Sequence, residues 1–267
     1  MITKTKKQEI LNYLKTKEEK INISNIIDKA NKSESSNILT HSNFLDLNEI
    51  QMMSRILDNG EINYKVYFPN VFCEKAVMFF IPEFLNEDEI NFNEYISCVK
   101  IDCKNYRKLS HKDFMGSIYS LGIKREVLGD IFVSDGIGYV YVLKNMAEFI
   151  ENDLLKVANQ TAICTILDLD SEESKNLKVD YIEKIYIVPS FRVDALLSEV
   201  YSLSRSESKQ KIVSGDMYIN AKEVINPAEN YKEGDIISFK RCGKLKVGKL
   251  VRKTKSENLC INIFKYN

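Results

Sequence analysis

The sequence lacks the features that mark membrane and exported proteins. Among its 267 residues there is no run of about 18 uninterrupted apolar residues, so no membrane-spanning helix is expected. The N-terminus is basic and leads into a polar helical pattern, without the apolar core of a signal peptide. These absences predict a cytoplasmic protein.

Metal-ligating residues and nucleotide-binding glycines are also scarce. The two histidines and six cysteines form no CxxC pair and no cluster, so neither a structural zinc ion nor another cofactor is expected. The cysteines are expected to be reduced thiols that pack as small apolar side chains. No glycine-rich fingerprint follows a predicted strand, which argues against a methyltransferase.

Charge is present in quantity and is unevenly distributed. The formal net charge of the chain is zero, but residues 192–267 hold 15 Lys and Arg against 9 Asp and Glu, a net charge of +6. The remaining residues therefore carry −6. Polarity of this kind is typical of a chain whose C-terminal part meets a polyanion, although a solvated basic surface would give the same count.

Residues 1–90 are expected to form a small α/β unit. Helical patterns occupy the first 32 residues, and a polar break follows at 31–37. A third helix is expected to start at Ser42 or Asn43. Two strands, each ended by proline, are expected within 62–69 and 75–82.

Residues 91–167 show the element order βαββαβ, which predicts a ferredoxin-like plait of the kind found in RNA-recognition domains. Tyr139 and Tyr141 alternate on the third predicted strand, where such domains stack bases. Lys124 and Arg125 lie in a loop beside the predicted sheet. These four residues are a candidate secondary RNA surface, but two tyrosines on one sheet face are also ordinary packing residues.

Residues 168–187 are expected to be a linker, and residues 188–267 a C-terminal domain. Apolar spacing predicts a helix from Arg192 to Val200, and Ser204 with Glu207 has the spacing of a capping box that starts a second helix. Gly215 is a stop signal for that helix. A strand pair around Asn220 and a further strand after residue 235 follow.

The C-terminal pattern resembles the S-four, or αL, RNA-binding domain, in which two short helices and a small sheet present a basic face to structured RNA. The matching positions lie within 190–240 and are Arg192, Asp194, Leu197, Ser204, Arg205, Ile212, Gly215, Ile219, Asn220, Gly234, Asp235 and Ile237. Ser208 stands where alanine is usual in that domain, and Ala221 where its hairpin commonly has glycine. The fold class implied is α+β.

A broader resemblance covers most of the chain. The segments 42–46, 109–133 and 188–197 resemble the YlmH family of bacterial proteins, with an N-terminal unit, a plait-like RNA-binding domain and an S-four domain. The resemblance implies a cytoplasmic protein that binds rRNA and tRNA on the large ribosomal subunit, in ribosome-associated quality control. The segment 72–82 departs from the arginine-rich run of the family.

The cations of the C-terminal domain are the candidate RNA-binding residues. Lysine and arginine on short rigid elements hold positive charge at fixed separations, and arginine can bind a phosphate with two hydrogen bonds. Asp194 is expected to orient Arg192 or to cap a helix. The RNA-binding residues predicted are Arg192, Arg205, Lys209, Lys211 and Lys222, with Arg241, Lys244 and Lys246 extending the surface.

Two alternatives to a non-enzymatic RNA-binding protein remain open. Arg192-Val193-Asp194 imitates the catalytic motif of pseudouridine synthases, although it opens the predicted binding domain and no catalytic domain follows it. His111 has no nucleophile paired with it by spacing, so no catalytic residue is predicted. The other alternative is an adaptor whose N-terminal unit docks a protein partner, such as a cell-division protein.

Overall fold

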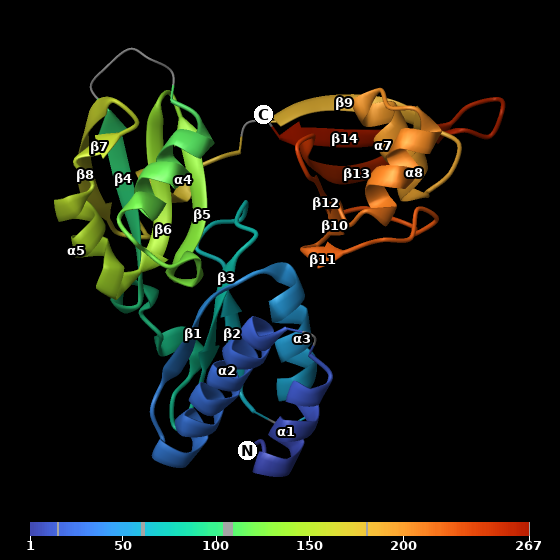
Figure 1. The fold of residues 1–267 in the computed structure, drawn as a ribbon. Helices are drawn as coiled ribbons and strands as arrows, with labels where there is room; N and C mark the ends of the chain where they lie inside the picture. Colours follow the sequence, from blue (N-terminus) through green and yellow to red (C-terminus); the bar gives the residue numbers. More distant parts are fainter. Residues whose placement is uncertain (15, 60–61, 104–108, 180, 267) are drawn as a thin grey trace. The chain divides into compact units, whose positions relative to one another are not determined.

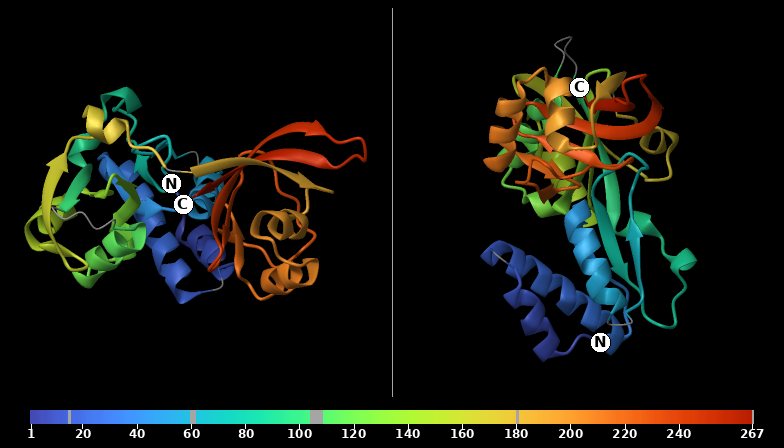
Figure 2. Two further views of the ribbon diagram at one scale, coloured as in Figure 1. Left: turned by 90° about the horizontal axis from the view of Figure 1, so that it is seen from above. Right: turned by 90° about the vertical axis from the view of Figure 1, so that its right-hand side faces the viewer.

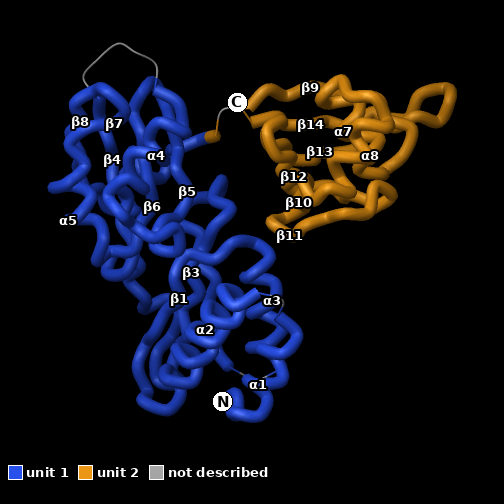
Figure 3. The backbone as a smooth tube through the Cα atoms, in the orientation of Figure 1, with its two compact units in different colours: residues 1–178 blue, residues 179–267 orange. Residues whose placement is uncertain are grey.

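The fold is described from a computed structural model that covers residues 1–14, 16–59, 62–103, 109–179 and 181–266 (Figures 1 and 2). Helices and several antiparallel sheets are mixed along the chain, which confirms the predicted α+β class. The chain divides into two compact units, residues 1–178 and 179–267 (Figure 3). Unit 1 holds both segments predicted as the first two domains.

The first part of unit 1 packs helices against a small sheet. Strands β1 (Thr40–Leu45), β3 (Ala76–Phe80) and β2 (Tyr64–Tyr67) form an antiparallel sheet in that order. The helices are α1 (Lys4–Asn12), α2 (Lys17–Ser36) and α3 (Leu47–Asp58). Apolar side chains of α2 and α3 form one core with residues of β1 and β3.

Two predictions for this part are wrong. The helix expected from Ser42 begins at Leu47, where the Asp46 carboxylate accepts a hydrogen bond of 2.9 Å from the Glu49 amide. Residues 40–45 are a strand because they pair with β3, and Leu45 is fully buried in the core that β3 shares. Helix α2 also continues through the expected polar break, since the buried Ser33 hydroxyl donates to the Phe80 carbonyl at 2.7 Å.

The second part of unit 1 has the predicted βαββαβ order. Its elements are β4 (Ile96–Cys103), α4 (His111–Ser120), β5 (Leu128–Ser134), β6 (Ile137–Leu143), α5 (Lys144–Asp153) and β8 (Gln160–Leu167), with short η1 (Glu87–Glu89), η2 (Phe92–Glu94), η3 (Arg125–Val127) and β7 (Lys156–Val157). The sheet order is β5-β6-β4-β8-β7, and all neighbours are antiparallel. Helices α4 and α5 share a core with one face of this sheet.

A linker was expected at 168–187, but most of these residues belong to one unit or the other. Helix α6 (Glu172–Lys175) packs on the sheet face opposite α4 and α5, and Ser174 and Leu177 are buried. The Asn70 side-chain amide donates to the carbonyls of Ser174 and Leu177 at 3.3 and 3.2 Å, which fixes the end of α6. Strand β9 (Tyr181–Val188) is part of unit 2.

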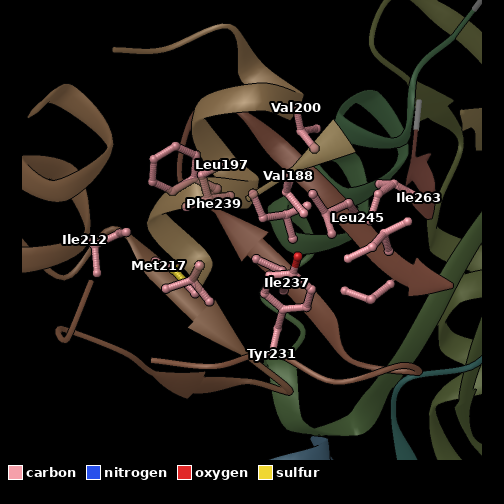
Figure 4. Packing of buried hydrophobic residues seen from close by; sticks show 14 of the residues in the cluster. Val188, Leu197, Val200, Ile212, Met217, Tyr231, Ile237, Phe239, Leu245 and Ile263 are labelled. Atoms are coloured by element: carbon pink, nitrogen blue, oxygen red, sulfur yellow. The ribbon is translucent and has the colours of Figure 1, made fainter. Parts of the chain in front are cut away.

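Unit 2 is a six-stranded antiparallel sheet with two helices on one face. The strands are β9, β10 (Met217–Ile219), β11 (Lys222–Glu223), β12 (Ile236–Phe239), β13 (Gly243–Lys253) and β14 (Leu259–Tyr266), in the order β11-β10-β12-β13-β14-β9. Helices α7 (Val193–Tyr201) and α8 (Arg205–Val213) bury Leu197 and Ile212 against Phe239 and Leu245 (Figure 4). We call this the helical face and the other the open face.

Candidate nucleic-acid interface

Two arginines of unit 2 converge on one buried carboxylate. Asp194, in the first turn of α7, is 0% exposed. The Arg192 guanidinium donates from Nε and Nη2 to its two oxygens at 3.1 and 3.0 Å, and Arg205 Nη1 lies 3.6 Å from Oδ2. The arginine side chains remain 41% and 46% exposed, so the group presents two guanidiniums and a net charge of +1. The expected role of Asp194 in orienting Arg192 fits this contact.

Helix α8 begins and ends where the sequence predicts. The Ser204 hydroxyl accepts from the Glu207 amide at 3.1 Å, and the Glu207 carboxylate accepts from the Ser204 amide at 2.9 Å. Hydrogen bonding of the Glu207 carboxylate to the Ser204 side chain and backbone amide lowers the pKa of Glu207. At the other end Gly215 takes a φ of +77°, which glycine adopts at little cost. Arg205 thus occupies the first helical position and Lys209 the same side one turn later.

The inner side of α8 contains a buried hydroxyl. Ser208 is 0% exposed, and its Oγ has no hydrogen-bond partner among the described residues. A buried polar group without a partner costs about 1–3 kcal/mol, and alanine is also the better helix former. Ser208, which stands where alanine is usual in the S-four pattern, is therefore expected to destabilise the packed side of α8.

Ser208→Ala is expected to raise the free energy of unfolding of unit 2 by about 1 kcal/mol, because it removes that hydroxyl. Urea-induced unfolding of the full chain would measure the shift. Ser206→Ala is the matched control, since Ser206 is exposed on the same helix. Equal shifts in both variants would show that helix propensity alone is responsible.

Three further predicted cations, Lys211, Lys222 and Arg241, lie on α8 or on the strands and turns next to it. Lys211 places its Nζ 5.7 Å from the centroid of the Phe239 ring. Lys222 pairs with Ile219, whose side chain packs partly on the core under the helices. Arg241 is exposed in the β12–β13 turn, which is held to the end of α8 because the Lys240 side chain donates to the Gly215 carbonyl at 3.0 Å.

Lys244 and Lys246 do not extend the α8 surface, contrary to the prediction. They alternate along β13 with Leu245 and Val247, which are buried in the core under the helices. Successive side chains of a strand point to opposite faces, so both lysines lie on the open face. The sequence shows that positive charge is concentrated in residues 192–267. It did not predict strand β13, which places Lys244 and Lys246 on the open face instead of the helical face.

The candidate secondary RNA surface is also corrected. Tyr139 and Tyr141 are 6% and 0% exposed, because α6 covers their sheet face. The Tyr139 hydroxyl donates to Glu173 at 2.7 Å, and the Tyr141 hydroxyl donates to the Ser174 carbonyl at 2.9 Å. Burial, with the hydrogen bond to Glu173, raises the pKa of Tyr139. Rings that are covered in this way cannot stack on bases.

Lys124 and Arg125 are exposed, as a loop position predicts. Arg125 opens η3, which Lys124 caps, just before the edge strand β5. The two cations are accessible, but the tyrosines of β6 are covered. They can contribute charge at the edge of the sheet, but they do not form a stacking platform with the tyrosines.

Comparisons with known proteins find a family match in the second part of unit 1. Residues 89–170 match the family model described as "Putative RNA-binding domain in YlmH". A curated relative, the ribosome-associated protein quality control protein P2 of Bacillus subtilis (strain 168), is 25% identical over 184 residues, which are 69% of this chain and 70% of the relative. The chain is similar to the YlmH family. The resemblance predicted from the sequence is confirmed.

A solved structure agrees at the level of the fold. The cell division protein YlmH from Streptococcus pneumoniae aligns with a TM-score of 0.50 and 14% identity, over 60% of this chain and 96% of that one. The match to the YlmH family model falls on the plait in unit 1, which carries Lys124 and Arg125, whereas the eight cations predicted as the main RNA-binding residues lie in unit 2. No helix among the described residues is long and apolar enough to cross a membrane.

Asp194 lacks the exposure that a catalytic aspartate needs. A nucleophilic carboxylate must reach its substrate, but Asp194 has no exposed surface and is held by two guanidiniums. His111 is the first residue of α4.

Proposed function

We propose that this protein is a non-enzymatic, cytoplasmic RNA-binding protein that associates with the large ribosomal subunit and with tRNA. It acts in the rescue or quality control of stalled ribosomes. The observation that carries the proposal is the pair of half-exposed guanidiniums anchored on Asp194, with Lys209 beside them on α8. The name of the Bacillus relative and the RNA-binding family model support the ribosomal part.

The geometry suits structured RNA. The major groove of A-form RNA is too narrow and deep for side chains to read, so proteins recognise its shape, phosphates and 2′-hydroxyls. Arg192 and Arg205 share one carboxylate, which restricts both side chains before RNA arrives and reduces the entropy lost on binding. Lys209 adds a flexible charge one turn along α8. Together they form the cationic surface of unit 2 that is best suited to phosphates.

The proposal is tested with the full chain in cells and in solution. We expect the protein to co-sediment with large ribosomal subunits in sucrose gradients of cell lysate. Purified protein should bind structured rRNA or tRNA with an affinity that falls as salt rises, with a log–log slope of roughly −0.9 for each phosphate neutralised. Sedimentation only with free protein, together with salt-independent or absent RNA binding, would contradict the proposal.

The same samples address the enzymatic alternative. RNA recovered after incubation with the protein is digested and its nucleosides are analysed by mass spectrometry. A non-enzymatic binder leaves the nucleoside composition at the level of an untreated control. Any modified nucleoside above that level, dependent on the protein, would show that binding serves catalysis.

A further inference from the structure

A second basic surface lies at the far end of strand β13. Strand β12 pairs with β13 only as far as Lys246, and the turn at 234–235 hydrogen-bonds to Val247. From Gly248 to Lys253 the outer edge of β13 has no strand partner among the described residues. An unpaired edge exposes backbone N–H and C=O groups as well as side chains.

Two irregularities change how this edge presents its side chains. The β13–β14 register shifts between Val247 and Leu250 and again between Leu250 and Arg252, and at each shift β13 uses one more residue than β14. Such bulges bend and twist a strand and redirect its side chains. The usual alternation of buried and exposed residues stops, and all five residues from 249 to 253 are exposed.

The redirected side chains are mostly cationic. We call the segment 249–255 the basic edge, and its cations are Lys249, Arg252, Lys253 and Lys255. The adjoining turn contributes one acid, Glu257, which forms an ion pair of 3.1 Å with Lys253. The other three cations have no ion pair among the described residues. The turn at 254–258 is held by hydrogen bonds from the Thr254 amide to the Asn258 carbonyl and from the Glu257 amide to the Thr254 carbonyl.

The basic edge is separate from the arginine pair. In both views of Figure 2 the red β13–β14 hairpin extends from unit 2 on the side away from the orange helices α7 and α8. None of its cations is among the RNA-binding residues predicted from the sequence. A polyanion bound along α8 would leave the basic edge available to another stretch of phosphates.

We propose that the basic edge, Lys249 to Lys255, is a second RNA-binding surface that contacts phosphates of the sugar–phosphate backbone. The inference rests on the proposed RNA-binding function. The excess of cations over acids on this hairpin matches a polyanion in charge. Sheet edges also carry lysines to prevent edge-to-edge aggregation, and the exposed Leu250 and Val251 beside the cations would suit an anionic membrane surface. Both are outcomes of the test.

The test replaces Lys249, Arg252, Lys253 and Lys255 by glutamine in the full chain. Binding to a structured tRNA transcript is measured by fluorescence anisotropy across a potassium chloride series. We expect roughly a tenfold loss of affinity at moderate salt and a log–log slope that is less steep by about two to four, since each lost phosphate contact removes roughly one. The control neutralises Lys4, Lys6, Lys17 and Lys156, which are exposed in unit 1 and give the same change in net charge.

The outcomes separate this inference from the proposed function. If the wild-type protein binds no RNA, the proposed function fails and the inference with it. If the wild type binds RNA and the basic-edge variant matches it in affinity and slope, only the inference is overturned. Aggregation of the variant without loss of affinity assigns the cations to edge protection. Loss of binding to vesicles of anionic phospholipid, with RNA binding intact, assigns them to lipid; either result overturns the inference.

Discussion

Reversing the charges of Arg205 and Lys209 together is expected to weaken RNA binding by about a hundredfold or more. A hydrogen bond to a charged group contributes about 1.5–3 kcal/mol, and each 1.4 kcal/mol is a factor of ten in affinity. Two such contacts are lost, and the new carboxylates repel phosphates. Arg205 is 46% exposed and Lys209 lies one turn along α8, so both can reach one RNA backbone.

The measurement is a salt titration of binding to tRNA and to large ribosomal subunits. Because Arg205→Glu also places a new acid beside Asp194, an Arg205→Gln, Lys209→Gln variant is measured in parallel and should show a smaller loss in the same direction. Lys4→Glu with Lys17→Glu is the control. These lysines open α1 and α2, where a carboxylate favours the helix. Equal binding by all variants would show that α8 does not contact RNA.

Replacing Asp194 by asparagine is expected to lower the free energy of unfolding of unit 2 by about 2–3 kcal/mol. Removing one partner of a buried ion pair costs about 3–5 kcal/mol, and solvent screening of the half-exposed guanidiniums reduces that figure. Asparagine fills the same volume, so the loss reports the charge: two guanidiniums are left facing each other without their shared counter-ion.

Hydrogen–deuterium exchange of peptides from α7 and β9 would measure this loss in unit 2 alone. Asp216→Asn is the matched control, because Asp216 forms a longer, partly exposed pair of 3.8 Å with Lys240 and should contribute about 0–1 kcal/mol. Protection in Asp194→Asn equal to that of the wild type would mean that the carboxylate orients the arginines without stabilising the fold.

Local signals were predictable from the sequence. The capping box at Ser204 and Glu207 and the stop at Gly215 depend on residues within a few positions of one another, and both are present. The hairpin at Asn220 and Ala221 is present too, with φ of +49° and +64°, which confirms that Ala221 occupies a conformation that favours glycine. Each of these features is fixed by the backbone of its own segment.

Features that depend on distant partners were not predictable in the same way. Tyr139 and Tyr141 have the alternation of an open sheet face, and only the packing of α6, more than 30 residues later, buries them. Residues 40–45 have a helix-compatible pattern and become a strand because β3 supplies the pairing. The β13–β14 pair was not predicted either, because lysines occupy many of its positions and the alternation of apolar residues in β13 stops after Val247.

The pairing of β9 with β14 has a consequence for how the protein is made. These are the first and last strands of unit 2, and they pair along their whole length, from Val188 with Leu259 to Tyr181 with Tyr266. Contacts so far apart in sequence form late and slowly. During synthesis the sheet stays incomplete until residues 259–266 have left the exit tunnel. A chain that lacks them would leave the backbone edge of β9 unpaired beside the exposed Ile185 and Ile187, and such an edge is prone to aggregate.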